Sequence, residues 1–233
     1  MSRIYYLFLI ICSFGVLAQW HNQACLLNYG DYIHDILQET LHELENDVKL
    51  CNLKIIDFNQ TIDQQMYSWY LGGIVVYSNG FVNSIEMVNV PAVSNMFTRR
   101  VNANYTEYFA GISATLDFDN VKLGMDVSTI IEGIGEGHYT GVFNMNRIRF
   151  TLGIQKNINT NITTVSITNS GTTATSQKMQ YLPNTNVTQV LSRMFNHNLM
   201  SNSYSTWAHD IILPIVTRNV GKYEFPEIRF DGC

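Results

Sequence analysis

The side chains that could carry out chemistry are few and are poorly arranged for it. His209 and Asp210 are adjacent, and Glu136 lies two positions before His138. An acid–base or nucleophilic centre needs such groups within hydrogen-bond reach of one another and of a reacting atom. Adjacent polar pairs are common by chance, and the sequence contains no Gly-x-Ser-x-Gly elbow, phosphate loop or dinucleotide fingerprint. We therefore expect a protein that is not an enzyme.

The cysteines are the next candidates, and their spacing favours a structural role. Cys12 lies in the N-terminal apolar segment, so the rest of the chain holds Cys25, Cys51 and Cys233. Three cysteines allow one disulfide and one remaining thiol, with three possible pairings. No Cys/His spacing resembles a zinc site, so we expect neither a metal nor a cofactor.

The N-terminal segment has the pattern of a secretory signal peptide. Arg3 is followed by an apolar run over residues 4–11 and then by small residues up to Ala18. This pattern predicts a signal peptide over residues 1–18, one domain over 19–233 and an extracellular location. The run is too short for a membrane anchor, and no other stretch could span a bilayer, so we expect no stable anchor.

Four Asn-x-Ser/Thr sequons support secretion, because this tripeptide is the acceptor for N-linked glycans. Each is a possible acceptor if its asparagine is exposed. The four asparagines are Asn59, Asn104, Asn161 and Asn186.

The charge balance argues against one class of partner. The formal net charge is −5, and removal of residues 1–18 makes it one unit more negative, because that segment contains Arg3 and no acidic residue. Nucleic-acid binding needs a basic surface, so we expect no nucleic-acid partner. For the same reason we expect only weak attraction to anionic lipid surfaces.

The longest predicted helix lies near the C-terminus, over residues 186–220. One face of this helix carries apolar or small side chains, with Asn186 as the N-cap and Gly221 just past the end. These side chains are Val187, Val190, Met194, Tyr204, Ala208, Ile211 and Ile215. Such a helix would be about 50 Å long at 1.5 Å per residue. The polar stretch 196–203 and Pro214 are expected to bend or interrupt it.

A first helix is predicted over residues 31–48, with Asp31 as its cap and one apolar stripe. Residues 49–65 are interpreted as a connection. From residue 66 the apolar period changes to two, which predicts strands. The predicted strands cover residues 69–77, 81–90, 96–103, 106–118, 121–128, 138–156, 165–168 and 180–182.

The turns between these strands are predicted from local residue types. Ser78-Asn79-Gly80 is a hairpin signal, Asp119-Asn120 a second turn and Gly133–Gly137 a third. Pro91 is expected to end or bend a strand. In strand 138–156 the apolar residues change from odd to even positions near Asn146, which indicates a β-bulge.

These elements together predict the fold class. Several predicted strands are about twice the usual length, and long, bulged strands favour a sheet that curls. A helix, an antiparallel meander and a long helix follow one another in α+β order. We predict a long, strongly curved antiparallel sheet wrapped around a long C-terminal helix, with the N-terminal helix beside it.

Three segments resemble a known family. Gly135-Glu136-Gly137-His138-Tyr139 is similar to a Gly-x-Gly-x-Tyr turn of takeout-like proteins. Residues 79–93 are similar to the second strand of mite group-seven allergens, and 190–214 looks like their last helix, proline included. The chain thus resembles the single-domain tubular lipid-binding proteins of arthropods, which include the takeout and juvenile-hormone-binding family. It departs from takeout-like proteins in the wide separation of Cys25 and Cys51.

The resemblance implies an elongated apolar tunnel that holds a lipid, a fatty acid or a terpenoid hormone, and no catalytic centre. Methionine suits such a cavity because its side chain adapts to irregular apolar shapes. Arg147 or Tyr139 at the tunnel mouth would select a polar head group. The expected lining residues are Leu37, Leu41, Leu44, Leu116, Met125, Phe143, Met145, Trp207, Ile211 and Ile215.

Without the resemblance, the same bulky residues are better explained as a packed core, and His197 as a half-buried histidine of the last helix. Two alternatives to a carrier stay open. One is a secreted defence protein that recognises microbial lipids, although the negative charge argues against it. The other is a glycoprotein that acts through its surface and has a filled core.

Overall fold

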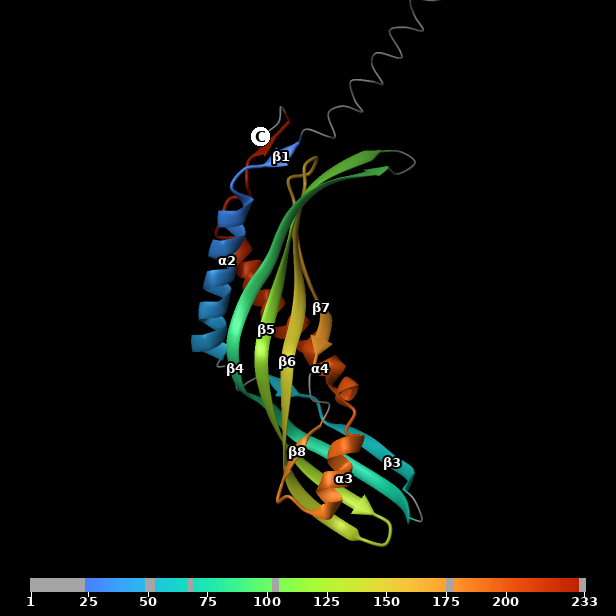
Figure 1. Ribbon diagram of the computed structural model, residues 1–233. Coiled ribbons are helices and arrows are strands. Elements are labelled where there is room, and N and C mark those ends of the chain that lie inside the picture. The colour runs from blue at the N-terminus through green and yellow to red at the C-terminus, as the bar shows by residue number, and fades with distance from the viewer. Residues whose placement is uncertain (1–23, 49–52, 67–68, 102–104, 175–177, 231–233) are drawn as a thin grey trace, which may run out of the picture.

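The computed structural model describes residues 24–48, 53–66, 69–101, 105–174 and 178–230. Over this part of the chain, seven antiparallel strands form one long, curved and twisted sheet, and helices pack against it (Figure 1). The α+β class with a curved antiparallel sheet is therefore confirmed.

The elements follow one another in the predicted order of helix, strands and C-terminal helices. The strands are β1 (Cys25–Leu26), β2 (Lys54–Ile55), β3 (Phe58–Met66), β4 (Trp69–Val101), β5 (Thr106–Ile131), β6 (Gly135–Asn157), β7 (Thr163–Thr173), β8 (Gln180–Leu182) and β9 (Ile228–Arg229). The helical segments are α2 (Tyr29–Glu43), η1 (Leu44–Val48), α3 (Asn186–Met194), η3 (His197–Met200), α4 (Ser201–Thr206), η4 (Trp207–Ile212) and α5 (Leu213–Val220).

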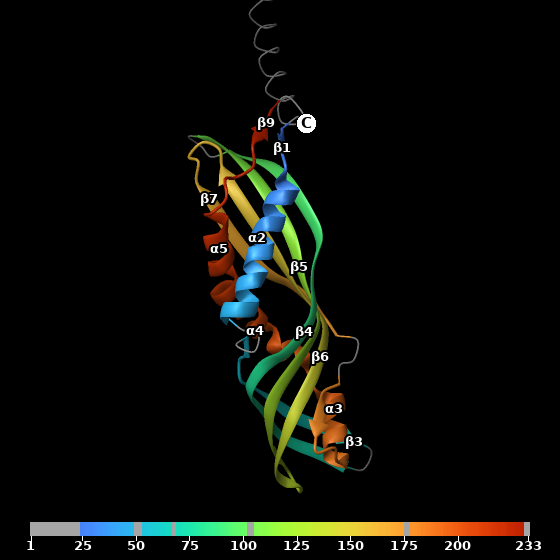
Figure 2. The same ribbon diagram turned by 90° about the vertical axis from the view of Figure 1, so that its left-hand side faces the viewer.

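The large sheet has the strand order β2-β4-β5-β6-β7, while β3 also pairs with β4 and β8 with β6. Figure 2 shows α2 and α5 side by side along one end of this sheet. Helix α3 lies at the opposite end, against β8. Strands β1 and β9 pair with each other and join the beginning of α2 to the segment that follows α5.

Two of the three predicted turns are wrong. Asn79 and Asn120 have the positive φ that a turn requires, 52° in each case. However, the chain continues in the same direction through both, within β4 and within β5. At Ser78–Phe81 the ladder with β5 shifts instead, which is a bulge. Gly80 is needed there because a Cβ atom would lie 2.5 Å from the Cβ of Ile55 on β2.

The curvature of the sheet follows from such irregularities along β4. The register between β4 and β5 shifts between Ser78 and Phe81, between Val82 and Ser84, and between Asn89 and Ala92. The third shift includes Pro91, which bends the strand as expected and does not end it. A bulge bends a strand and increases its twist, so three of them curl this edge of the sheet.

In β6 the buried side chains change from odd to even positions, as predicted, and the buried side chains of β5 show a change of the same kind. Buried positions are odd up to Met145 and even from Ile148 in β6, and they change from Phe118 to Val121 in β5. The prediction of a β-bulge near Asn146 is wrong for the ladder between β5 and β6, because these two strands keep one register throughout. Both strands change phase at the same level, so their ladder stays continuous.

The sequence pattern also missed β2 and β3, which occupy the predicted connection 49–65. Strand β3 pairs with β4 over its whole length. Polar residues occupy most of its positions, and Ile62 is buried with 2% of its surface exposed. A strand with so few apolar residues carries little of the alternation on which strand prediction depends.

The long C-terminal helix is interrupted at Phe195, close to the polar stretch where an interruption was expected. Thr185, one residue before the predicted cap, closes a capping box with Thr188, and α3 ends at Met194. Phe195 then adopts ψ 126°. The Gln60 amide on β3 replaces the lost helical hydrogen bonds, because its Nε2 donates to Met194 O at 2.5 Å and its Oε1 accepts from the Asn196 N–H at 3.1 Å.

The second predicted irregularity, at Pro214, is a widening of the helix. The π-helical segment η4 directly precedes α5, whose first turn contains Pro214. Proline has no N–H to donate and its ring crowds the preceding turn, so a π-helical turn accommodates it. The helix ends at Val220, and Gly221 follows, as predicted.

The first helix begins earlier than predicted, and it is joined to α5 by polar contacts. Asn28 is its N-cap, so Asp31 lies in the first turn. Between α2 and α5, Asn219 Nδ2 donates to the buried Thr40 hydroxyl at 3.2 Å. Toward the solvent, Arg218 forms an ion pair with Glu43. In the described residues, no helix is long and apolar enough to cross a membrane.

Candidate ligand-binding site

The ten residues expected to line a tunnel all lie in or against one hydrophobic core. Eight are buried, with at most 6% of their surface exposed, while Leu41 and Ile211 are partly buried. They come from α2, η1, β5, β6 and the C-terminal helices, so the fold unites residues that are distant in sequence. Whether they enclose a tunnel stays a prediction, because the pockets described below open to solvent.

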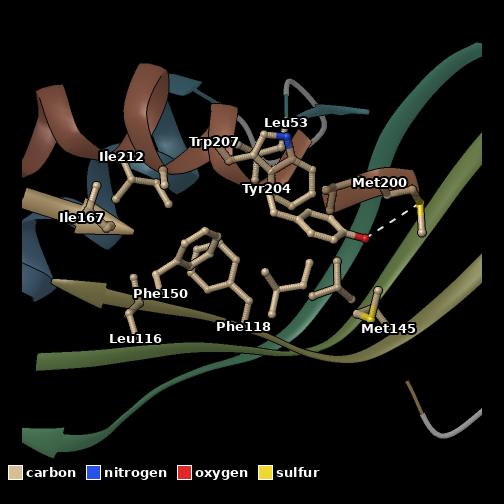
Figure 3. Packing of buried hydrophobic residues seen from close by; sticks show 14 of the residues in the cluster. Leu53, Leu116, Phe118, Met145, Phe150, Ile167, Met200, Tyr204, Trp207 and Ile212 are labelled. Atoms are coloured by element: carbon tan, nitrogen blue, oxygen red, sulfur yellow. Dashed lines mark hydrogen bonds between the residues drawn. The ribbon is translucent and has the colours of Figure 1, made fainter. Parts of the chain in front are cut away.

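The middle of this core holds a tyrosine hydroxyl among apolar groups (Figure 3). Tyr204 on α4 has 1% of its surface exposed, and its hydroxyl donates a hydrogen bond to the sulfur of Met200 at 3.8 Å. A thioether is a weak acceptor, so this hydroxyl is poorly satisfied for a buried group. Burial raises the pKa of Tyr204, which keeps the phenol protonated as a donor. Tyr204 lies on the apolar face predicted for this helix, but no local signal in the sequence marks its hydroxyl as a polar group in the core.

Methionines are concentrated in the same core. Met125, Met145, Met179 and Met200 are all buried, with at most 2% of their surface exposed. Their unbranched, polarisable side chains can repack around different apolar shapes at little cost. The core therefore has the composition of an interior that tolerates variable contents.

Trp207 anchors the C-terminal helices to the edge of the sheet. Its ring is fully buried and contacts Tyr204 edge-on at 5.2 Å between centroids. Its indole N–H donates to the Lys54 carbonyl of β2 at 2.6 Å. This contact fixes the position of Tyr204 relative to the strands.

Aromatic residues fill the end of the core that lies under α3. The hydroxyls of Tyr77 and Tyr181 are 3.0 Å apart, and burial raises the pKa of Tyr77 to about 12. Phe195, at the break between α3 and η3, packs against Phe143 at 5.0 Å between centroids. His197 is half-buried, as expected, and stacks on Phe143 at 6.0 Å.

A pocket of about 400 Å³ lies between β8 and α3 and opens to solvent. Its wall includes Met179 and Tyr181, which are also members of the buried core. Lys178 and Arg193 are the charged residues that line it. No local motif marks these two cations in the sequence, because one follows a Ser/Thr-rich loop and the other lies on an exposed helix face.

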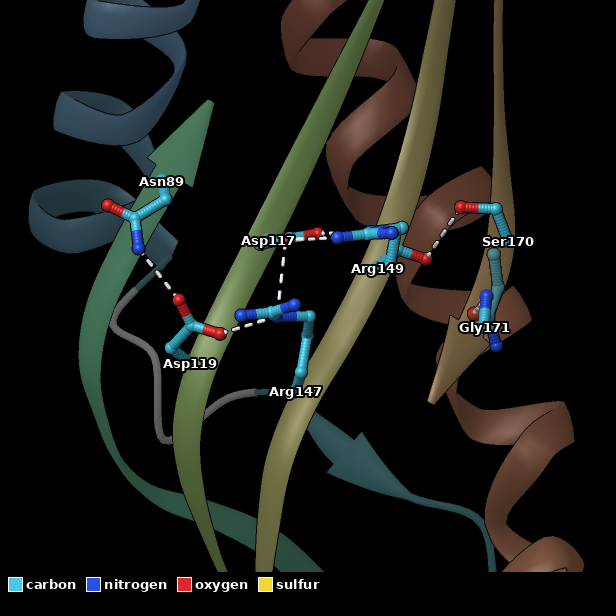
Figure 4. Close-up of polar contacts among 8 residues, drawn as sticks. Asn89, Asp117, Asp119, Arg147, Arg149, Ser170 and Gly171 are labelled. Carbon is cyan, nitrogen blue, oxygen red and sulfur yellow. Dashed lines mark hydrogen bonds and ion pairs between the residues drawn. The ribbon is translucent and has the colours of Figure 1, made fainter. Parts of the chain in front are cut away.

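The two residues expected to select a head group lie in different places. Tyr139 lines a separate open pocket of about 500 Å³ together with Asp126 and His138. Arg147 is instead held on a face of the sheet by Asp119 at 2.8 Å and by Asp117 at 3.2 Å (Figure 4). An arginine neutralised by two carboxylates is a poor head-group ligand, so the expected pairing of Arg147 with a tunnel mouth is not supported.

The carboxylates around Arg147 form a small network across three strands. Asp117 is 2% exposed and receives two hydrogen bonds of 2.7 Å from Arg149, through Nε and Nη2. Asp119 accepts from Arg147 and, at 2.7 Å, from the Asn89 amide. These contacts bridge β4, β5 and β6 where the strands change phase, so they fix the register there.

Substituting Asp119→Asn is expected to make the free energy of unfolding depend less on pH in the acidic range. The hydrogen bond from Arg147 holds the pKa of Asp119 below its usual value. The carboxylate therefore stabilises the fold above its unfolded-state pKa, and this stability is lost as the pH falls through the folded-state pKa. At pH 7 the variant should be less stable by about 1 kcal/mol.

Urea denaturation of both proteins between pH 7 and pH 2 tests this expectation. The difference between wild type and D119N should shrink as the pH falls below about 4. A difference that stays constant over that range would show that the carboxylate charge contributes nothing. D126N is the matched control, because Asp126 accepts a hydrogen bond from the Asn79 side-chain amide at 2.9 Å in place of one from an arginine.

The structure places the other candidate residues on the surface or leaves them undescribed. Asn59, Asn161 and Asn186 are exposed, as glycan acceptors must be. The signal peptide, Asn104, Cys51 and Cys233 lie outside the described residues, so the cysteine pairing and secretion stay predictions. The pairs His209–Asp210 and Glu136/His138 are exposed. In the part of the chain that the structure describes, no His, Cys, Asp or Glu cluster could hold a metal.

Comparisons with known proteins give likenesses to solved structures alone. No protein-family model matches the chain, and no curated protein matches it. One similar solved structure is described as a crystal structure of lipopolysaccharide binding protein, with a TM-score of 0.45 and 12% sequence identity. The match covers 80% of this chain and 38% of that one, so the present chain spans well under half the length of the protein that it resembles.

Proposed function

We propose that the protein binds an apolar small molecule, such as a lipid, a fatty acid or a terpenoid, between its curved sheet and its C-terminal helices, and carries it outside the cell unchanged. The resemblance of residues 79–93, 135–139 and 190–214 to the arthropod lipid-binding family supports this proposal. Burial of the ligand's hydrocarbon would contribute about 25 cal/mol per Å² before the costs of ordering.

The observation that carries the proposal is the Tyr204 hydroxyl in the methionine-rich core. Buried hydroxyls normally have an oxygen or nitrogen partner, and among the described residues this one has only the Met200 sulfur. A ligand with a polar atom along its apolar part would provide the missing acceptor, while the four buried methionines adapt to the rest of it. A core built only for stability gains nothing from placing a phenol there, because phenylalanine would fill the same volume.

A fluorescent fatty acid titrated into solvent-extracted protein tests the proposal. Saturable binding at one molecule per chain, reversed by unlabelled fatty acid, is the expected result. Fluorescence that rises without saturation, or that competitor fails to reverse, would contradict it.

Substituting Tyr204→Phe separates ligand binding from packing. Removing the hydroxyl should weaken a ligand that carries a hydroxyl or carbonyl by about 3- to 10-fold, the effect of one lost hydrogen bond. The stability of the ligand-free protein should be unchanged or slightly higher, because a poorly satisfied polar group is removed. Equal affinity of both proteins for every polar ligand tested would show that the hydroxyl faces no ligand.

The second candidate, recognition of anionic microbial lipids, has one observation in its favour. Arg99 and Arg100 lie at the end of β4, beside Val101 and Tyr105, whose surfaces are 64% and 57% exposed. Basic and aromatic side chains together suit an anionic lipid surface. Salt-sensitive sedimentation with phosphatidylglycerol vesicles, abolished in an Arg99→Glu/Arg100→Glu variant, would favour this candidate. Absence of vesicle binding at low salt would reject it.

A further inference from the structure

The pocket between β8 and α3 differs from its surroundings in charge. The chain carries a formal charge of −5, yet the two charged residues that line this pocket, Lys178 and Arg193, are both cations. None of the described residues that line it is acidic. An open pocket that shares Leu182 with it is lined by Asp126 and by no lysine or arginine of the described residues. The pocket is thus a local site of positive charge on an acidic protein.

The walls of the pocket are held in place by specific contacts. Ser192 on α3 donates its hydroxyl to the Met179 carbonyl at 2.5 Å, which ties the helix to the segment before β8. Met179 in turn lies so close to β6 that a Cβ atom at Gly141 would be 2.7 Å from its sulfur. Thr188, another wall residue, is fixed in the capping box of α3. The wall residues next to Lys178 and Arg193 are therefore held in place.

The inner wall of the pocket continues into the core. Met179 has no exposed surface, and Tyr181 is 4% exposed and bonded to the hydroxyl of Tyr77. These residues belong to the same buried cluster as Phe143 and Phe195. A molecule in this pocket would have cations near the solvent and apolar side chains toward the interior.

We propose that this pocket binds the anionic head group of an amphiphile, a carboxylate or a phosphate, whose hydrocarbon extends toward the core past Met179. The inference rests on the proposed function and adds the class of ligand to it. Arginine binds both head groups through two parallel N–H donors, and lysine adds a point charge. A pocket of about 400 Å³ holds a head group and the first carbons of a chain.

The test compares ligands that share one oleoyl chain and carry either an anionic or a neutral head group. Oleic acid, methyl oleate and 1-oleoyl lysophosphatidic acid are titrated into solvent-extracted wild-type protein and into a Lys178→Gln/Arg193→Gln variant. Both substituted residues are exposed, so the variant should fold normally, and its melting temperature is measured as a check. Lys122→Gln/Arg229→Gln removes the same charge at exposed positions elsewhere and serves as the control.

Wild type is expected to bind at least one of the two anionic ligands 10-fold or more tightly than methyl oleate. The double variant should lose that advantage, while its affinity for methyl oleate and the affinities of the control stay within 2-fold. Preference for oleic acid or for the lysophosphatidic acid identifies the head group as carboxylate or phosphate. Equal wild-type affinity for all three ligands, or undiminished anion binding by the variant, would overturn this inference and leave the proposed function standing. Absence of binding of all three would overturn both.

Discussion

Replacing Trp207 by alanine is expected to lower the free energy of unfolding by about 3–5 kcal/mol, the range for removing a large buried aromatic ring. The ring has no exposed surface, contacts Tyr204, and donates its N–H to the Lys54 carbonyl (Figure 3). The substitution removes the ring's apolar burial, leaves a cavity and breaks the bond between η4 and β2. Chemical denaturation followed by circular dichroism measures the change.

Two companion variants make the result interpretable. Trp207→Phe keeps most of the apolar volume and loses the hydrogen bond, so it should cost less, about 1–3 kcal/mol. Leu199→Ala alters a residue of η3, two helical segments before η4, that is 37% exposed, and it should change stability by under about 0.5 kcal/mol. A loss below 1 kcal/mol in Trp207→Ala would mean that η4 does not anchor the helices to the sheet.

Replacing Met145 by tryptophan is expected to reduce fatty-acid uptake at least 10-fold, while the ligand-free protein loses less than about 1 kcal/mol of stability. Met145 is fully buried on β6, in the region of the Tyr204 hydroxyl (Figure 3). If this region accommodates a guest, the larger indole occupies the guest's space. If the core is already filled, the added atoms must displace their neighbours, which costs about 1–3 kcal/mol.

The combination of stability and uptake distinguishes these cases. Met145→Leu conserves volume and should leave both quantities nearly unchanged, within about 1.5 kcal/mol for stability. A tryptophan variant that is strongly destabilised and still takes up ligand normally would place the ligand elsewhere. Thermal unfolding and fluorescent fatty-acid titration of the same preparations provide both values.

The fold class could be predicted because apolar periodicity is a local signal. The alternation in 106–118 and 138–156 identified the two central strands, and the helical stripe identified the C-terminal segment. The two false turns at Asn79 and Asn120 have a physical cause. An asparagine with positive φ occurs both in tight turns and in bulges, and only the pairing of the flanking residues with β5 and its neighbours distinguishes them.

The candidate site was harder to predict because its polar groups come from distant segments. The expected lining residues were recognised as apolar, and the structure confirms their burial, but burial alone does not distinguish a tunnel from a packed core. The Tyr204 hydroxyl is informative only because Met200 is its partner. Lys178 and Arg193 form a cationic pocket only because β8 pairs with β6 and α3 lies against β8.

Mass spectrometry of an organic extract of the purified protein shows directly whether the chain carries an apolar ligand. The protein is produced in secreting eukaryotic cells, and wild type and Met145→Trp are extracted in parallel. We expect close to one amphiphilic molecule released per wild-type chain and little from the tryptophan variant. An empty wild-type extract, together with no saturable uptake by the extracted protein, would contradict it.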